Sequence, residues 1–270
     1  MYADRLRQIL VIIFTIGQFV TGYIAGQVFG DVPREALYTE PIYFLPASYT
    51  FAVWGVILIF SVVYAIYQAW RGQSQRTIHR HVGWWVMLNT VGFSAWTWLA
   101  LQAGTNTTEY TNQVASLVTV LVSIAMLFVN VVAFRATLIL KDDLTSSDKQ
   151  FVMLPIAVYF SWITIATIAN FTSYFAAIGW AGNQFDSLIA IILLIIATGI
   201  GGVITINWDT ASAKVAYTAV MMWAAIGIAV ANLNQSLAVS GISLGVTLIM
   251  LSVVVYSVNH RNHHLQHNLI

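Results

Sequence analysis

The sequence predicts an all-α fold, a polytopic membrane bundle of about eight transmembrane helices. Of the 270 residues, 59% are hydrophobic and only 8% are charged, and the mean hydropathy is +0.78. This composition lies well outside the range of water-soluble domains. The apolar residues form segments of about 20 residues or more, which is the length that a helix needs to cross a bilayer.

Eight segments are long and apolar enough to be transmembrane helices. They cover residues 7–29, 49–70, 82–103, 114–140, 151–178, 186–207, 213–232 and 238–259. The first is expected to stay in the protein as a helix, because it lacks a small-x-small exit site before a polar region. Since the number of spans is even, both termini are expected on the same side of the membrane.

The distribution of lysine and arginine supports this count. With both termini in the cytoplasm, ten of the eleven cations fall on the cytoplasmic side: Arg5, Arg7, Arg71, Arg76, Arg80, Arg135, Lys141, Lys149, Lys214 and Arg261. Only Arg34 falls on the other side. This asymmetry is what the positive-inside rule requires. We therefore expect an integral protein of the bacterial inner (cytoplasmic) membrane with both termini cytoplasmic.

Small residues recur at four-residue spacing in the first and last segments. Gly22, Gly26 and Gly30 lie in or just after the first, and Gly241 and Gly245 lie in the last. Glycines at this spacing let two helix backbones approach closely. Packing within the chain is the favoured interpretation, and a homodimer interface is the alternative.

The longest outside connection, residues 31–48, is rich in proline and aromatic residues. It contains Pro33, Pro41, Pro46, Tyr38, Tyr43 and Phe44. The prolines stiffen the loop, and the aromatic side chains give it an apolar surface. Either a lid over the mouth of the bundle or a simple interfacial cap fits this composition.

Aromatic and amide side chains mark the second and third segments. Phe51 and Trp54 share one face of the second, whereas Asn89 and Trp96 lie on one stripe of the third. An asparagine at mid-membrane depth must have a hydrogen-bond partner in protein, water or ligand. A bond between helices is the favoured partner for Asn89.

The fifth segment, residues 151–178, is too polar to face lipid alone. Steps of three or four place six residues on one helix face: Pro155, Tyr159, Trp162, Ala166, Asn170 and Ser173. We expect this face to be turned towards other helices or towards a ligand.

The lack of cysteine, and of charged or histidine side chains in the middle of the helices, excludes several functions. There is no cysteine, and away from their ends the helices carry no acidic, basic or histidine side chain. A proton pump, a retinal protein or a membrane haem protein would need such a group at depth. His79, His81, His260, His263, His264 and His267 lie in a loop and in the tail, where solvated side chains are favoured over a metal site. The net charge of +1 gives no indication of nucleic-acid binding.

Three segments resemble the tryptophan-rich sensory protein and translocator protein family. The motif P-x-x-F-x-P-x-x-x-x-F-x-x-W-G runs from Pro41 to Gly55. The third segment carries Leu88-Asn89 followed by Trp96, and the fifth carries Pro155, Tyr159, Trp162 and Asn170. Two features depart from the family pattern: Pro155 and Tyr159 are not adjacent, and three further helices follow, as in a larger branch of the family.

The resemblance implies a five-helix bundle over residues 1–180, with three additional helices and a short cytoplasmic tail over 181–270. It also implies a pocket that opens towards the first loop and binds tetrapyrroles, sterols or similar flat apolar molecules. Carried over residue by residue, the candidate site consists of Phe51, Trp54, Asn89, Trp96, Tyr159, Trp162 and Asn170. Indoles can stack on a flat ligand while amides fix its orientation.

Three functions follow from these residues. The first is a sensor or carrier that binds a tetrapyrrole, sterol, carotenoid or other lipid without covalent or metal bonds. The alternative is a non-catalytic subunit of a larger, possibly pigment-containing, membrane complex. An enzyme ranks last, because the buried side chains supply no obvious acid or base. The expected partners are membrane lipid, a hydrophobic small molecule and a second copy or larger complex.

Overall fold

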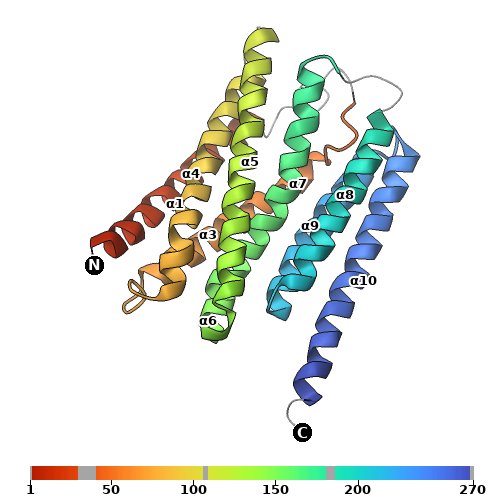
Figure 1. Cartoon of the computed structure of the whole chain (residues 1–270). Helices are drawn as coiled ribbons and strands as arrows, with labels where there is room; N and C mark the ends of the chain where they lie inside the picture. Colours follow the sequence, from red (N-terminus) through yellow and green to blue (C-terminus); the bar gives the residue numbers. More distant parts are fainter. Residues whose placement is uncertain (1, 30–40, 106–108, 181–185, 268–270) are drawn as a thin grey trace.

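The computed structural model describes residues 2–29, 41–105, 109–180 and 186–267, and every regular element in this part of the chain is helical (Figure 1). The eight long helices are α1 (Tyr2–Phe29), α3 (Val53–Ala69), α4 (Thr77–Thr105), α5 (Glu109–Ile139), α7 (Leu154–Ala177), α8 (Asp186–Asn207), α9 (Ala211–Ala231) and α10 (Leu237–His267). The short elements are the 3₁₀ turns η1 (Ser48–Ala52) and η2 (Lys141–Asp143), the single turn α6 (Ser146–Asp148) and the π-helical turn η3 (Lys149–Met153).

Seven of the long helices are long and apolar enough to cross a membrane by length and composition. The exception is α4, whose tryptophan, asparagine and glycine residues lower its hydropathy. It is nevertheless 29 residues long and packs against α1 and α5. The prediction of an all-α membrane bundle is confirmed.

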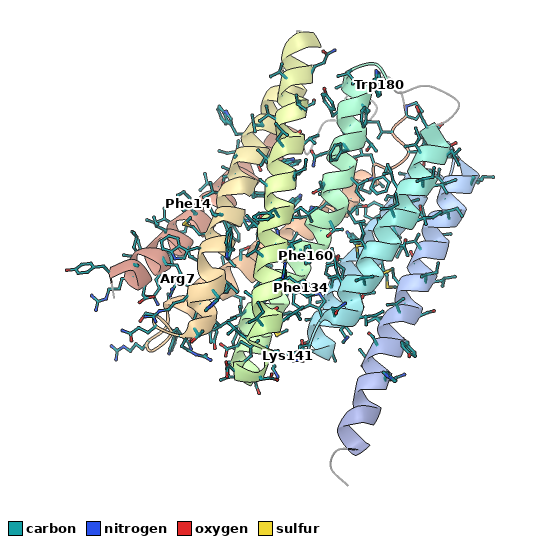
Figure 2. All side chains as sticks on the ribbon, viewed as in Figure 1. Arg7, Phe14, Phe134, Lys141, Phe160 and Trp180 are labelled. Carbon is teal, nitrogen blue, oxygen red and sulfur yellow. The ribbon has the colours of Figure 1, made fainter. Side chains whose placement is uncertain are left out.

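Helix α7 is the central helix of the bundle. It packs against α3, α5, α8 and α9, and every residue from Pro155 to Ile165 is buried. Phe160, for example, contacts Phe134 of α5 with a distance of 5.6 Å between ring centroids (Figure 2). The other long helices form two groups around it, α1, α3, α4 and α5 in one group and α8, α9 and α10 in the other (Figure 1).

The first half of α7 is buried on all its faces, whereas the sequence suggested a single polar stripe. Polar side chains outside the stripe also bind neighbouring helices. The Ser161 hydroxyl donates to the Tyr217 carbonyl of α9 at 2.6 Å. The Thr167 hydroxyl lies between two acceptors, the Ile163 carbonyl of its own helix at 2.8 Å and the Ser123 carbonyl of α5 at 3.3 Å. These bonds satisfy hydroxyls that have no water to bind inside a bilayer.

The segment that leads into α3 is fixed on α9. The amide of Ala47 donates to the Gly227 carbonyl at 3.0 Å. The Trp223 indole donates to the Thr50 carbonyl at 2.8 Å, and the Asn232 amide donates to the Tyr43 carbonyl at 2.8 Å. Residues 30–40, which include most of the proposed lid, lie outside the described residues. The described end of this connection is therefore held by the second group of helices.

Both termini lie at one end of the bundle, together with the connections 70–76, 140–146 and 208–210 (Figure 1). We call this the terminal end. Ion pairs tie its elements together, because Arg80 of α4 binds both carboxylate oxygens of Asp4 at 2.9 and 2.8 Å. Arg76 binds Asp148, whose carboxylate also accepts from the Thr145 amide in a capping box.

The glycines at four-residue spacing in α1 and α10 were expected to contact other helices of the chain, and most of them do not. A methyl group added at Gly241 or Gly245 of α10 would meet no described heavy atom within 4 Å beyond its own helix. In α1 a methyl group at Gly26 likewise meets nothing, whereas one at Gly22 meets Leu58 at 3.4 Å and Phe93 at 3.6 Å. Gly30 lies outside the described residues. The interpretation as intrachain contacts is therefore wrong for α10, because that face of the helix is turned away from the bundle.

Gly227 makes the closest helix contact of this kind. A Cβ atom there would lie 2.0 Å from the Thr50 hydroxyl oxygen, so Gly227→Ala must push η1 away from α9. We expect a loss of roughly 1–3 kcal/mol of stability, the usual cost of overpacking, measured as thermal unfolding in detergent. Gly199→Ala on α8 is the control, because its added methyl group meets no described heavy atom within 4 Å. Equal unfolding temperatures for the two variants would contradict this contact.

Candidate ligand-binding site

Six aromatic side chains from η1, α3, α4 and α7 meet in one group, which we call the aromatic cluster: Phe51, Trp54, Phe93, Trp96, Tyr159 and Trp162. Trp54 is at its centre. The distance from its ring centroid is 4.5 Å to Phe93, 5.9 Å to Tyr159, 6.0 Å to Trp162 and 6.3 Å to Trp96. The structure thus brings together residues from three of the segments that the sequence singled out.

The rings pack mainly edge to face. The interplanar angles are 80° for Trp54 with Trp162, 82° for Trp54 with Tyr159 and 84° for Phe51 with Trp162. This geometry places the positive edge of one ring on the negative face of another and stabilises each pair by about 0.5–1.5 kcal/mol beyond burial. A flat ligand that enters the cluster has to replace some of these ring contacts with its own.

Exposure distinguishes two sides of the cluster. Tyr159 and Trp162 are 6% and 1% exposed and form its inner wall. Phe51 is 38% exposed, and Trp54 and Trp96 are half-buried. The exposed side of the cluster is therefore the side of η1 and the start of α3.

Two hydrogen-bonded pairs fix the orientation of the rings. The Trp96 indole donates to the Asn170 side-chain oxygen at 3.0 Å, and the Asn170 amide donates to the Ala166 carbonyl at 2.8 Å. The Tyr159 hydroxyl accepts from the Gln18 amide at 3.3 Å and donates to the Asn89 carbonyl at 3.4 Å. Asn170 thus positions an indole, and Tyr159 joins α7 to α1 and α4.

Asn89 lies apart from the rings. Its side-chain oxygen accepts from the Asn130 amide of α5 at 3.0 Å, and the Asn130 amide also donates to the Met126 carbonyl at 2.8 Å. The side chain of Asn89 is therefore engaged in the interhelical bond that the sequence favoured. Only its backbone carbonyl reaches the cluster, through Tyr159.

Among the residues of the aromatic cluster and the side chains that hydrogen-bond to it, two buried polar atoms have no hydrogen-bond partner in the described part of the chain. They are the indole Nε1 of Trp162 and the side-chain oxygen of Gln18. Buried polar groups are nearly always paired, so each such atom calls for an explanation. A bound ligand with two polar groups would supply an acceptor for the Trp162 N–H and a donor for the Gln18 oxygen.

Sequence reasoning missed Gln18 and Phe93. Gln18 is an uncharged polar residue within the first apolar segment, and this is the signal that could have found it, because such a residue must be paired inside a bilayer. Phe93 lies four residues after Asn89 and three before Trp96, so it shares their helix face. Periodicity alone could have added it to the candidate site.

The described histidines differ in burial, because His81 and His260 are exposed and His79 is buried. Among the described residues, no group of three or more His, Asp or Glu side chains could hold a metal ion. The expectation of a solvated loop side chain is wrong for His79, which belongs to α4 and contacts Tyr64 and Tyr67, with 5.8 and 5.5 Å between ring centroids. Burial lowers the pKa of its imidazole to about 4. The side chains of His263, His264 and His267 lie outside the described residues.

The fold and the aromatic cluster define a class: an α-helical integral membrane protein with a cluster of indoles and phenols inside its bundle. More specifically, the chain belongs to the TSPO-like family, since the family model described as TSPO-like protein matches residues 8–256. This match reaches from α1 into α10, so it includes the last three helices. A search of curated proteins and a search of solved structures found no match. The division at residue 180 stays a prediction.

The Asn89–Asn130 pair makes a quantitative prediction about stability. Asn89→Leu removes the oxygen that accepts from the Asn130 amide at 3.0 Å and the amide that lies 3.5 Å from the Asn130 oxygen. We therefore expect a loss of about 1 kcal/mol, typical of a hydrogen bond between membrane helices. The Asn89→Leu/Asn130→Leu double variant should lose less than the sum of the single variants, because no amide is then left unpaired. Unfolding in detergent measures all three, and strictly additive losses would show that the two amides do not interact.

Proposed function

We propose that this protein binds a flat apolar ligand, of the tetrapyrrole, sterol, carotenoid or lipid class, at the aromatic cluster and acts as a sensor or carrier for it. The observation that carries the proposal is the unpartnered indole N–H of Trp162, buried beside Trp54 and Phe51. It combines a hydrogen-bond donor with faces on which a conjugated ring system can stack.

The unpaired atoms narrow the choice of ligand. Trp162 supplies a donor and Gln18 supplies an acceptor, so a suitable ligand carries polar atoms at its edge. A porphyrin carboxylate or a sterol hydroxyl meets this requirement, whereas an unsubstituted hydrocarbon such as a carotene does not. Ligands with a polar edge are therefore favoured within the proposed class.

The chemistry of the cluster supports binding rather than turnover. Its side chains are indoles, phenyl rings and a phenol, joined by the amides of Asn170 and Gln18. At neutral pH none of these groups is a good general acid or base. An enzymatic function therefore ranks below binding.

Membership of a larger membrane complex is the alternative function. The exposed side chains of α8 and α10 are mostly aliphatic, for example Ile192, Ile195 and Leu248, and such faces suit lipid as well as a partner protein. This alternative stays a prediction, and recovery of the chain alone or as a homodimer in a mild-detergent pull-down would argue against it.

Protoporphyrin IX is a practical probe of the cluster. Purified protein titrated with it should show quenching of tryptophan fluorescence. Trp162→Phe keeps a ring but removes the N–H, so affinity should fall about fivefold or more, as expected for loss of a hydrogen bond worth about 1 kcal/mol. Trp54→Ala should weaken binding further, because it removes the central ring.

Trp98→Phe is the matched control for this titration. Trp98 lies on α4 two residues after Trp96 but is 63% exposed, so its substitution should leave the affinity unchanged. If Trp54→Ala, Trp162→Phe and Trp98→Phe all bind like the parent protein, the ligand site lies outside the aromatic cluster.

The proposed location is the bacterial inner membrane with both termini in the cytoplasm. The absence of cysteine makes single-cysteine labelling direct. Ser147→Cys at the terminal end should react with a membrane-impermeant maleimide only after the cells are permeabilised, because the cations gather at that end. Asn234→Cys in the turn before α10 should react in intact cells, and the reverse pattern would invert the topology.

A further inference from the structure

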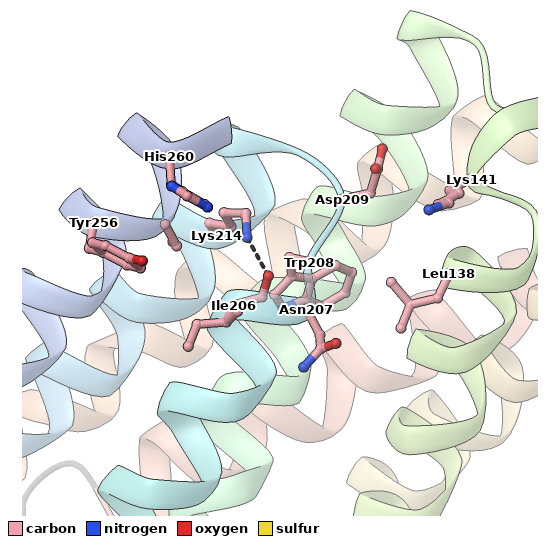
Figure 3. Close-up of a pocket in the computed structure, with 10 residues that line it drawn as sticks. Leu138, Lys141, Ile206, Asn207, Trp208, Asp209, Lys214, Tyr256 and His260 are labelled. Carbon is pink, nitrogen blue, oxygen red and sulfur yellow. Dashed lines mark hydrogen bonds between the residues drawn. The ribbon is translucent and has the colours of Figure 1, made fainter. Parts of the chain in front are cut away.

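A cavity lies at the terminal end of the bundle, at the opposite end from η1. Its volume is about 470 Å³, and it is bounded by the end of α5, the α8–α9 turn and α10 (Figure 3). The residues that give it chemical character are Lys141, Trp208, Asp209, Lys214, Tyr256 and His260. The aromatic cluster shares no residue with it.

The cavity has an excess of cationic side chains. Lys214 is 4% exposed, and its ammonium group donates to the Thr205 carbonyl at 3.2 Å and to the Ile206 carbonyl at the end of α8 (Figure 3). These bonds fix a buried cation in the cavity wall. Lys141 approaches from the side of α5 (Figure 3). Asp209 is the one carboxylate among the lining residues, and its oxygen lies 3.6 Å from the Lys149 ammonium.

Trp208, one of the lining residues, carries a buried donor. The Trp208 side chain is 1% exposed, and its indole Nε1 has no hydrogen-bond partner among the described residues. Packing on Phe134, with 4.5 Å between ring centroids, holds the ring in place. An oxygen atom of an anion in the cavity would supply the acceptor that this N–H lacks.

The position of the cavity suits a lipid headgroup. It lies where α5 and α8 end, α9 begins and α10 runs out of the bundle (Figure 1), which is the level of the membrane surface. Tyr256 is 64% exposed and stacks on His260 at 5.5 Å, and amphipathic aromatics favour this interface. Leu138 and Ile206 add apolar surface to the lining, where the glycerol and first acyl carbons of a lipid can pack.

We propose that this cavity binds the phosphate group of an anionic lipid headgroup, through Lys141, Lys214 and the Trp208 N–H. Basic pockets between transmembrane helices at the membrane surface bind such headgroups. The proposal is independent of the ligand bound at the aromatic cluster. Free inorganic phosphate has the same chemistry, and the experiment separates these two sources.

The test uses the full-length protein in neutral detergent, with native mass spectrometry to count bound lipids. Phosphatidylglycerol should bind more tightly than phosphatidylcholine with the same acyl chains. Lys141→Gln should weaken phosphatidylglycerol binding about fivefold, the effect of one cation near the membrane surface. Trp208→Phe, which keeps a ring and removes the N–H, should also weaken it.

Arg71→Gln is the matched control, because Arg71 is an exposed cation at the same end and does not line the cavity. It should leave phosphatidylglycerol binding unchanged. Competition with inorganic phosphate identifies the source: displacement that depends on Lys141 would support a phosphate site filled from solution. The proposal is overturned if Lys141→Gln and Arg71→Gln weaken binding equally, or if phosphatidylcholine binds as tightly as phosphatidylglycerol.

Discussion

The complete burial of the first half of α7 is the constraint on which the rest of the structure depends. A helix that contacts protein on every side must find the partners of its polar side chains in the protein or in a bound ligand, because a bilayer offers no water to replace a missing partner. Ser161 therefore donates to the Tyr217 carbonyl of α9, Thr164 bonds the Tyr217 hydroxyl, and Tyr159 accepts from Gln18 of α1. Since the hydrophobic effect does not draw helices together in lipid, such bonds and close packing hold these helices around α7.

The aromatic cluster follows from this arrangement. Trp162 and Tyr159 belong to the buried face of α7, and the rings of α3 and α4 pack against them. Phe51 reaches the cluster from η1, which α9 holds through Gly227 and Trp223. Helix α9 therefore helps to shape a site that it does not line with an aromatic ring, and the family match over residues 8–256 includes this helix.

The two candidate sites have opposite chemistry and lie at different levels of the bundle. The aromatic cluster offers ring faces with one unpaired donor and one unpaired acceptor, which suits a largely apolar guest. The cavity at the terminal end offers two lysines and an indole donor, which suits an anion. The separation follows the membrane itself, because its interior favours stacking and its surface favours charge.

The sequence alone determined the class of protein, the positions of the long helices and which three of them carry the aromatic candidate residues. It could do so because hydropathy and helical period are local properties of a segment. It placed Trp54, Trp96, Tyr159 and Trp162 among the candidate residues, and the tertiary structure brings their rings into contact. Only the tertiary structure decided that Asn89 faces Asn130, that Gln18 reaches Tyr159, and that the glycines of α10 meet no other helix. Helical period assigns a residue to a face, but which neighbour meets that face depends on the packing of the whole bundle.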